Sequence, residues 1–373
     1  MIKGNTLILT KKAALLIVLA VVFVFALIAF ILLNQKMLSK PRQLAFSPDS
    51  EYAFTGNGFL YIAGSSVKYS DLTETSKNYT GKLPHGDMQL SGYGRDTHVV
   101  YDSATLCIIG LTEAVTPAGS IEDVVCGDGF AACLISDGDQ RSVCVYNLKG
   151  EKVEEITSDD TITDFGFTHS AKEQLYVITL NTASDALVST IRTYDPSVPA
   201  MTGIITVQDQ LIEDIIFTKK SIYVSGTTNL IRYDAADNRE SYRLIKRGYH
   251  VNGYYEKDNN VYFMMYANEN DNRSVRIYST SQSTVPSERI VPLQLPDNTL
   301  GVFVHEDYIY AVTAAAAYRY NMSGTLKKSE AIDVLVDSVY TTGKGNLIIA
   351  SENRLFSVSI TGTNFLMQMF EKK

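Results

Sequence analysis

Four aspartates of this chain share one position in a recurring sequence unit, and they are its best candidates for chemistry. Each stands two residues after an apolar residue that opens a short β-rich stretch; the four are Asp123, Asp164, Asp214 and Asp337. If such carboxylates converge, their oxygen atoms can hold a hard cation such as Ca²⁺. Two of them, such as Asp123 and Asp214, can instead act as general acid and general base on a glycan or a peptide.

A local structural role is the competing interpretation of these aspartates. Short acidic side chains readily accept hydrogen bonds from backbone N–H groups of the turn in which they stand. The equivalent positions of two other units carry Gly253 and Val302, which interrupt any ring of acids. The pattern therefore favours local hydrogen bonding. It predicts no cofactor, and Ca²⁺ is the one candidate ion.

The elements that position these aspartates follow from the spacing of the unit. The apolar residues that open it are Ile121, Ile162, Ile212, Val251, Leu300 and Leu335. Their separations are 41, 50, 39, 49 and 35 residues, and each interval accommodates four short strands with their turns, as in one blade of a β-propeller. Runs such as 221–225 and 261–266 are short, β-branched or aromatic and bounded by turn residues, which argues against helical repeats.

The sequence therefore predicts an all-β fold, a β-propeller over residues 46–373. Two further units, 51–79 and 88–119, precede the six, which gives eight four-stranded blades. Seven blades are the alternative, because a strand from one terminus commonly completes the blade of the other. The second strands of four successive units carry a tyrosine: Tyr176, Tyr223, Tyr262 and Tyr310. This regularity predicts packing between blades rather than a carbohydrate-binding platform.

The N-terminal segment predicts a membrane anchor. The segment from Ala13 to Leu33 contains 21 residues without a charged or polar side chain. A helix of that length spans about 31 Å, the thickness of the hydrocarbon core. A cleaved signal peptide is the alternative, but no small-residue cleavage site follows the segment.

The orientation of this anchor follows from the lysines beside it. Lys11 and Lys12 adjoin the apolar segment, which favours a cytosolic N-terminus. We therefore expect a cytosolic tail of residues 1–12, one transmembrane helix over residues 13–33, a linker of residues 34–45 and an extracytoplasmic propeller. The protein would be a single-pass protein of the cytoplasmic membrane.

The charge of the chain disfavours nucleic acid as a partner. Residues 43–373 carry 27 basic and 41 acidic side chains, a net charge of −14. A surface of this sign repels phosphate backbones and anionic headgroups. The basic residues of the first 42 positions alone are expected to contact lipid headgroups.

Other chemical motifs are few. The sequence has no G-x-S-x-G, H-E-x-x-H or Walker motif, and no G-x-G-x-x-G between strand and helix. Its five histidines are scattered, which favours solitary roles over a metal cluster; they are His85, His98, His169, His250 and His305. Cys133 and Cys144 face each other if a hairpin over 130–148 turns at Gly138-Asp139. A cross-strand disulfide is then conceivable, although buried free thiols are the favoured interpretation.

The layout of the chain resembles that of a known group. The short tail, the single apolar span and blades of the form Leu175-Tyr176-Val177 and Leu230-Ile231-Arg232-Tyr233-Asp234 are similar to uncharacterised membrane-anchored propellers of Gram-positive Firmicutes, a domain of unknown function. The resemblance implies a location in the cell envelope. It implies no activity and no site residues.

Two functions remain in competition. The first is a non-enzymatic module that binds an envelope protein or a cell-wall polymer through hairpin loops near residues 137–140, 181–185 and 268–272. It is favoured because no catalytic set is recognisable. The alternative is an envelope enzyme that processes a glycan or a peptide with the carboxylates at the channel mouth. Signalling across the membrane is a weaker third hypothesis, since a 12-residue tail has little room for an output domain.

Overall fold

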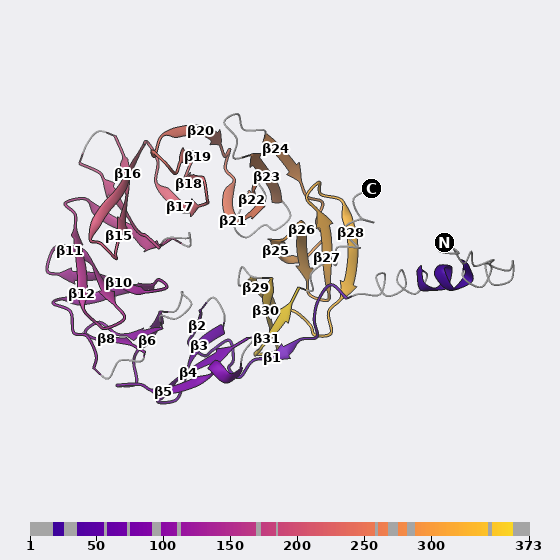
Figure 1. Cartoon of the computed structure of the whole chain (residues 1–373), viewed down its shortest axis with the longest axis horizontal. Coiled ribbons are helices and arrows are strands. Elements are labelled where there is room, and N and C mark those ends of the chain that lie inside the picture. Colours follow the sequence, from indigo (N-terminus) through magenta and orange to yellow (C-terminus); the bar gives the residue numbers. More distant parts are fainter. Residues whose placement is uncertain are drawn as a thin grey trace, which may run out of the picture.

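A computed structural model describes most of the chain. The described residues are 18–25, 36–55, 58–72, 75–91, 98–109, 113–168, 173–183, 186–257, 260–267, 275–281, 288–341 and 345–360. Within them the chain forms eight antiparallel sheets, which stand as blades in a ring (Figure 1). The predicted all-β propeller with eight blades is therefore confirmed.

The first three blades occupy the N-terminal part of the ring. Blade 1 comprises β2 (Tyr52–Phe54), β3 (Gly58–Ala63), β4 (Ser66–Asp71) and β5 (Tyr79–Lys82), with the short 3₁₀ helix η1 (Thr75–Lys77) before its last strand. Blade 2 comprises β6 (Gln89–Ser91), β7 (Val99–Tyr101) and β8 (Leu106–Ile108). Blade 3 comprises β9 (Ser120–Cys126), β10 (Phe130–Asp137), β11 (Gln140–Asn147) and β12 (Lys152–Thr157).

The next four blades each have four strands. Blade 4 comprises β13 (Thr161–Phe167), β14 (Leu175–Asn181), β15 (Val188–Asp195) and β16 (Ala200–Gln208). Blade 5 comprises β17 (Ile212–Phe217), β18 (Ser221–Gly226), β19 (Asn229–Asp234) and β20 (Glu240–Ile245). Blade 6 comprises β21 (His250–Lys257), β22 (Asn260–Tyr266), β23 (Val275–Ser281) and β24 (Glu288–Pro292). Blade 7 comprises β25 (Thr299–His305), β26 (Tyr308–Thr313), β27 (Ala316–Asn321) and β28 (Leu326–Ala331).

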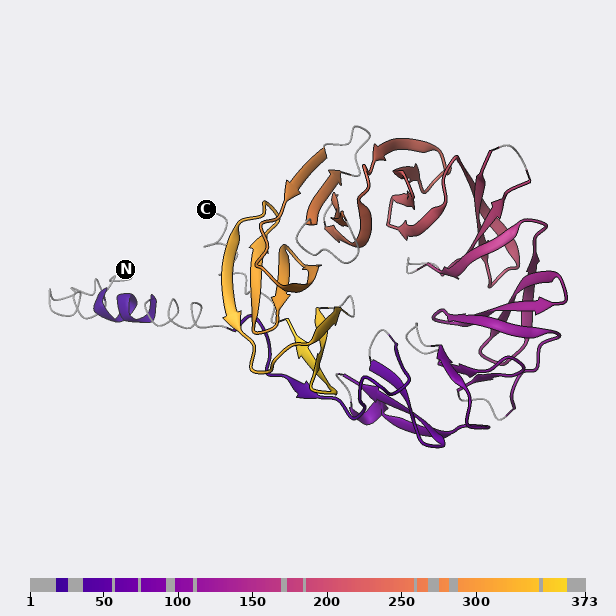
Figure 2. The same cartoon turned by 180° about the vertical axis from the view of Figure 1, so that it is seen from behind.

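Blade 8 closes the ring with a strand from the other end of the chain. It comprises β29 (Ser338–Thr341), β30 (Asn346–Ser351), β31 (Arg354–Ser359) and, outside them, β1 (Arg42–Gln43). Figure 2 shows the indigo start of the ring beside its yellow end. The ring is thus closed by a short segment that precedes blade 1, and blade 1 keeps its own four strands. The structure therefore favours eight blades over the alternative of seven.

The closing segment lies within the stretch expected to be a linker. Residues 34–45 were assigned to that linker, yet Met37 and Leu38 are buried, with 1% and 5% of their surfaces exposed. Leu38 forms an isolated bridge with Ile360, and the N–H of Ser39 donates to the carbonyl of Ser359 at 2.8 Å. In the structure the propeller therefore includes residues from Met37 onward.

Blade 2 departs from the four-strand expectation. Its described residues form three strands, and an isolated bridge between Leu106 and Val115 takes the place of a fourth. The other seven sheets have four strands each.

The predicted membrane segment lies mostly outside the described residues. Of the segment from Ala13 to Leu33, residues 18–25 are described; they form a helix whose large apolar side chains, such as Phe23 and Phe25, are exposed. Within the described parts of the chain, no helix combines the length and the apolar character that crossing a membrane requires.

Tyrosines of the second strands pack between blades, as the sequence predicts. The ring of Tyr176 in blade 4 lies 5.8 Å from that of Phe217 in blade 5. The ring of Tyr223 in blade 5 lies 4.9 Å from that of Phe263 in blade 6, in an edge-to-face arrangement. These contacts belong to apolar clusters shared by neighbouring sheets, so the core of the propeller is a series of interfaces between blades.

The cysteines illustrate how tightly these interfaces exclude water. Cys133 of β10 lies directly opposite Cys144 of β11, as predicted, and both are buried free thiols. Burial raises the pKa of each thiol, and nearby Cys126 raises that of Cys133 further. Because the thiolate is the reactive form, both thiols should be inert in the folded protein.

We predict that a thiol reagent such as Ellman's reagent at pH 8 modifies Cys133 and Cys144 only after unfolding. Partly exposed Cys107 is the one described cysteine expected to react slowly in the native state. The measurement is the thiol count per chain before and after adding guanidinium chloride without reductant. A count of four after unfolding fits the structure, whereas a count of two would show that a disulfide had formed. Cys107→Ser should remove the native-state reaction.

Candidate functional site: the carboxylates of the inner strands

The innermost strands of five consecutive blades carry a β-bulge at the same place. In β9, β13, β17, β21 and β25 the pairing with the second strand slips by one residue, which leaves a single residue unpaired. The residues just after the bulge are Asp123, Asp164, Asp214, Gly253 and Gly301. The recurring pattern of an apolar residue and an aspartate two positions later therefore marks this bulge in blades 3, 4 and 5.

Asp337 does not share the position that the sequence pattern assigned to it. In blade 5, Asp214 pairs with Ser225, which is the second-last residue of β18. In blade 8, the second-last residue of β30 is Ala350, and it pairs with Ser338. Asp337 lies one position earlier, and its carboxylate accepts the N–H of Glu352 at 2.8 Å in the turn between β30 and β31. It therefore holds a hairpin and does not extend the row of acids.

The strand pairing also corrects one of the two positions, Gly253 and Val302, at which the sequence pattern lacks an aspartate. The residue of blade 7 that corresponds to Asp214 is Gly301, which pairs with Val312, and the neighbouring Val302 points to the opposite face of its strand. Gly253 of blade 6 stands where it was expected.

The three equivalent aspartates make the local hydrogen bonds that the sequence favours. The Val124 N–H donates to Asp123 Oδ1 at 2.8 Å, and the Ile215 N–H donates to Asp214 Oδ1 at 2.8 Å. The carboxylate of Asp164 likewise accepts a backbone hydrogen bond from Phe165. Each carboxylate is thus fixed against the bulge of its own strand.

These carboxylates also interact with one another across blade boundaries. They reach solvent but are closely surrounded by protein, and this partial burial raises the pKa values of Asp164 and Asp214. The backbone hydrogen bonds act in the opposite direction. The negative charge of Asp123 raises the pKa of Asp164 further, and the negative charges of Asp164 and Glu213 raise the pKa of Asp214 further. Blades 3, 4 and 5 therefore place three like charges within electrostatic range of their neighbours.

Glu51 extends this row, and the sequence pattern did not reveal it. The Ile62 N–H donates to its carbonyl, and the carboxylate accepts the N–H of Leu90 at 2.9 Å, which links blade 1 to blade 2. Burial raises the pKa of Tyr101 to about 12, and the charges of Asp123 and Glu51 contribute. No apolar residue stands two positions before Glu51, so its unit lacks the signal of the others. We call Glu51, Asp123, Asp164 and Asp214 the acidic arc.

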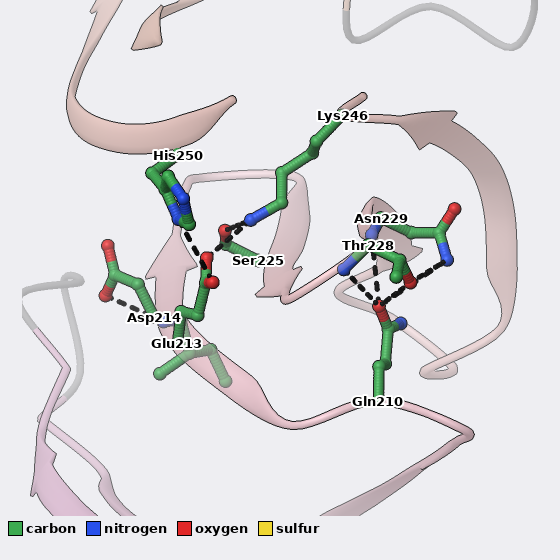
Figure 3. Close-up of polar contacts among 9 residues, drawn as sticks. Gln210, Glu213, Asp214, Ser225, Thr228, Asn229, Lys246 and His250 are labelled. Carbon is green, nitrogen blue, oxygen red and sulfur yellow. Dashed lines mark hydrogen bonds and ion pairs between the residues drawn. The ribbon is translucent and has the colours of Figure 1, made fainter. Parts of the chain in front are cut away.

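A buried ion pair fixes the connection that leads from blade 5 to blade 6, beside this arc. Figure 3 shows Lys246, which follows β20, pointing at Glu213, the bulged residue of β17. Lys246 Nζ lies 2.5 Å from Glu213 Oε2 and 3.0 Å from Ser225 Oγ, and the lysine side chain is 0% exposed. His250 Nδ1 lies 3.1 Å from the other carboxylate oxygen of Glu213. These residues form a network that ties two sheets together.

Buried Gln210 fixes the neighbouring hairpin in the same view. Its Oε1 accepts hydrogen bonds from the backbone N–H groups of Thr228 at 3.3 Å and Asn229 at 3.0 Å (Figure 3). The Lys246 N–H in turn donates to the carbonyl of Thr228. The hairpin between β18 and β19 is therefore held by the connections that enter and leave blade 5.

The histidines that the structure describes lie in separate surroundings. His85 lies 3.0 Å from Asp102, His98 lies 2.8 Å from the hydroxyl of Tyr79, and burial lowers the pKa of His305. His169 lies outside the described residues. Across the described residues, no group of three or more His, Cys, Asp or Glu side chains is arranged to hold a metal ion.

The acidic arc and the predicted binding loop at 137–140 lie on the same face of the propeller. Asp123 pairs with Leu134, close to the turn that joins β10 to β11, and Asp214 pairs with Ser225, close to the turn that joins β18 to β19. We call this face the arc face. The loop at 137–140 is the tight turn that the sequence predicts, with Asp137 opposite Gln140. Residues 184–185 and the loop at 268–272 lie outside the described residues.

Replacing the two central acids should stabilise the protein at neutral pH. Because folding raises the pKa values of Asp164 and Asp214, each carboxyl group favours the folded state when it is protonated and loses this contribution as the pH rises through the folded pKa. Asparagine keeps the oxygen that accepts the backbone N–H. We therefore expect Asp164→Asn/Asp214→Asn to gain at most about 1 kcal/mol at pH 7.5, since solvent screens these groups, and to gain little at pH 4.

Urea unfolding at the two pH values measures this effect. Asp237→Asn, on an exposed turn with Arg239, is the matched control for the loss of acidic charge. A double variant that is less stable than the wild type at pH 7.5 would contradict the prediction.

Comparisons with known proteins bear on the fold and the family. A family profile matches residues 101–360, which is more than half of the chain and covers the propeller from blade 2 to blade 8. The chain belongs to this family. It is described as a Family of unknown function (DUF5711). The expected resemblance to a propeller domain of unknown function is therefore confirmed for the fold and the family. A search of curated proteins found no match.

Solved structures of other propellers share the architecture at low sequence identity. The WD40 domain of SCAP from fission yeast aligns with a TM-score of 0.57 at 11% identity, over 87% of this chain and 98% of that one. BamB from Moraxella catarrhalis aligns with a TM-score of 0.52 at 11% identity, over 86% of this chain and 99% of that one. The computationally designed protein Ika8 aligns with a TM-score of 0.51 at 12% identity, over 86% and 100% of the two chains. These likenesses concern the fold alone.

Proposed function

We propose that this protein is a non-enzymatic binding module, anchored in the cytoplasmic membrane, that docks a partner protein of the cell envelope on its arc face. The observation that carries the proposal is the acidic arc. The carboxylates of Asp123 and Asp214 accept backbone hydrogen bonds, stand on the innermost strands of their blades and lie beside the hairpin turns of the same face. A fixed row of negative charge suits a partner segment that carries lysine or arginine.

The anchor is part of the same proposal. It rests on the 21 apolar residues from Ala13 to Leu33 and on the exposed apolar side chains of the helix over residues 18–25. Lys11 and Lys12, beside the apolar segment, favour a cytosolic N-terminus and an extracytoplasmic propeller. The resemblance to anchored propellers of Gram-positive Firmicutes supports a location in the envelope.

Crosslinking in intact cells tests the proposal. Cells that produce the full-length chain are treated with a membrane-impermeant, lysine-reactive crosslinker, and captured material is identified by mass spectrometry. We expect a partner that the wild type retains and that Asp123→Asn/Asp164→Asn/Asp214→Asn loses, whereas the matched control Asp209→Asn/Asp237→Asn retains it. Loss of the partner in both variants, or in neither, would exclude the arc as the docking surface.

The labelling itself tests the topology. If the propeller lysines are labelled but no protein partner is captured, the result would support the anchor and indicate that the ligand is a cell-wall polymer. An unlabelled propeller in intact cells that becomes labelled after lysis would place it in the cytosol.

An envelope enzyme is the second candidate, and one observation favours it. The raised pKa values of Asp164 and Asp214 are typical of carboxyl groups that act as general acids. Hydrolysis of a wall glycan or peptide by the purified chain, abolished by Asp214→Asn and retained by Asp237→Asn, would replace the binding proposal with this one.

A further inference from the structure

A pocket of about 390 Å³ lies where the outermost strand of blade 5 meets blade 6. Its lining is cationic and aromatic, with Arg243, Arg247, Arg276, Tyr242, Tyr249 and Tyr278 among the contributing residues. Exposed Ile245 and Ile290 add an apolar rim, with 65% and 51% of their surfaces accessible. Among the described residues that line the pocket, none is acidic.

The charge of the pocket is only partly compensated. Arg243 is paired with Glu240 through two hydrogen bonds of 2.8 and 2.9 Å, and the buried Lys246 is paired with Glu213. Within the described part of the chain, Arg247 and Arg276 have no carboxylate partner. Two positive charges therefore stand in one pocket of a domain whose net charge is strongly negative. A site of this sign attracts a negatively charged ligand.

Arg276 is held in position by an aromatic ring. Its guanidinium carbon lies 4.1 Å from the centre of the Tyr249 ring, which is the geometry of a cation–π contact. Such a contact restricts the side chain and leaves the N–H groups at the edge of the guanidinium group available to a ligand.

Arg247 occupies a backbone conformation that disfavours arginine. The Tyr249 N–H donates to the carbonyl of Lys246 at 3.1 Å, so residues 246–249 form a tight turn. Its two central residues, Arg247 and Gly248, have φ values of 53° and 80°. Asparagine, aspartate and glycine are favoured at such positions, and a side chain such as arginine is strained there. Strain of this kind points to a function that requires the side chain.

The buried ion pair explains how this turn is kept in place. Lys246 opens the turn, its Nζ is bound by Glu213 and Ser225, and its N–H donates to Thr228. The residue before Arg247 is thus fixed by one side-chain and one backbone anchor. The positions of Arg247 and Tyr249 are determined before any ligand arrives.

We propose that this pocket, the arginine pocket, binds the carboxylate of an organic acid that has an aromatic or aliphatic body, with Arg247 and Arg276 as the anion-binding residues. Guanidinium groups bind a carboxylate through paired N–H donors. The Tyr249 ring and the rim residues Ile245 and Ile290 then cover the apolar body of the acid. The volume lies within the range of small-molecule sites. This site is separate from the acidic arc, and its failure would leave the proposed docking face untouched.

Titration of the full-length purified chain with 4-phenylbutyrate tests the proposal. The comparison ligands are 4-phenylbutyramide, which keeps the body and lacks the charge, and inorganic phosphate, which keeps a charge and lacks the body. We expect the acid to bind at least about 10-fold more tightly than either one, because a charge-assisted hydrogen bond contributes enough for such a difference. Three outcomes would overturn the proposal: equal binding of acid and amide, tighter binding of phosphate, or no binding of the acid. The last is tested up to about 10 mM, which is ten times a dissociation constant of about 1 mM.

Two variants separate ligand binding from structure. Arg276→Gln should weaken binding of 4-phenylbutyrate about 10- to 100-fold. Arg247→Asn should weaken it similarly while the melting temperature stays the same or rises, because asparagine tolerates the turn conformation. Arg239→Gln, at an exposed arginine of blade 5 outside the pocket, is the matched control and should bind as the wild type does. Unchanged binding in Arg276→Gln and Arg247→Asn would contradict the assignment.

The source of the carboxylate is distinguished by a second pair of probes. A tripeptide with a C-terminal phenylalanine carboxylate is compared with its C-terminal amide. Binding of the peptide acid at least about 10-fold tighter than that of 4-phenylbutyrate would identify a protein or peptide end as the ligand. Weaker binding of the peptide acid would identify a free organic acid.

Discussion

Lys246→Met is expected to lower the free energy of unfolding by about 3 kcal/mol, near the lower end of the range for breaking a buried ion pair. The lysine side chain is fully buried, so its loss leaves the Glu213 carboxylate, 28% exposed, with only His250 as a charged partner. Ser225 loses its donor as well. Methionine fills most of the volume of the lysine stem, so the loss reports on charge rather than on a cavity. Urea unfolding of the full-length chain measures it.

A matched exposed pair and a double variant complete this test. Lys152 pairs with Glu155 on the outermost strand of blade 3, where both side chains are about half exposed, and Lys152→Met should leave the free energy of unfolding nearly unchanged. Glu213→Gln/Lys246→Met should be more stable than Lys246→Met alone, because no uncompensated charge remains. Equal losses in Lys246→Met and Lys152→Met would show that the buried pair contributes no more to stability than the exposed one.

The blades could be predicted because each repeats a local signal. A strand of alternating or continuous apolar residues, a turn residue and a tyrosine near a strand end recur within about 40 residues, and each feature depends on its own unit. The opposition of Cys133 and Cys144 was predictable for the same reason, since one tight turn at Gly138-Asp139 sets the register of the hairpin.

Features that depend on distant parts of the chain could not be read in this way. The pair between Glu213 and Lys246 joins the first strand of blade 5 to the residue after its last strand, 33 positions apart, and nothing in either local sequence specifies it. The misplacement of Asp337 has another cause. In blades 3, 4 and 5 the aspartate follows a β-bulge, whereas β29 pairs with β30 without a register shift, so the same sequence spacing puts Asp337 at a different place in space.

The acidic arc contains residues that local sequence predicts and one that it does not. Asp123, Asp164 and Asp214 carry the local signal of the bulge and were identified from it. Glu51 joins them only through the packing of blade 1 against blade 2, and its own segment lacks the pattern. Arg247 of the arginine pocket likewise gives no sequence signal, because its strained backbone is visible only in the folded turn.

The closing strand leads to the second large expected effect. A fragment of residues 46–373, the domain boundary suggested by the sequence, should be less stable than a fragment of residues 36–373 by about 3–5 kcal/mol. The shorter fragment lacks buried Met37 and Leu38, and burial of such a side chain contributes about 1.5–3 kcal/mol. It also lacks β1 and the hydrogen bonds that the N–H groups of Ser39 and Leu44 donate to blade 8. Urea unfolding of the two fragments measures the difference.

Aggregation should distinguish loss of closure from a general loss of stability. Without β1, strand β31 becomes an unpaired edge, and such edges pair with other chains. We therefore expect the shorter fragment to self-associate in light scattering below its unfolding transition, and a synthetic peptide of residues 36–45 to reverse this. Lys36→Ala in the longer fragment removes an exposed side chain and leaves β1 in place, and it should have no effect. Equal stability and equal solubility of the two fragments would mean that the ring holds together without its closing strand, and that the interfaces between blades alone determine its stability.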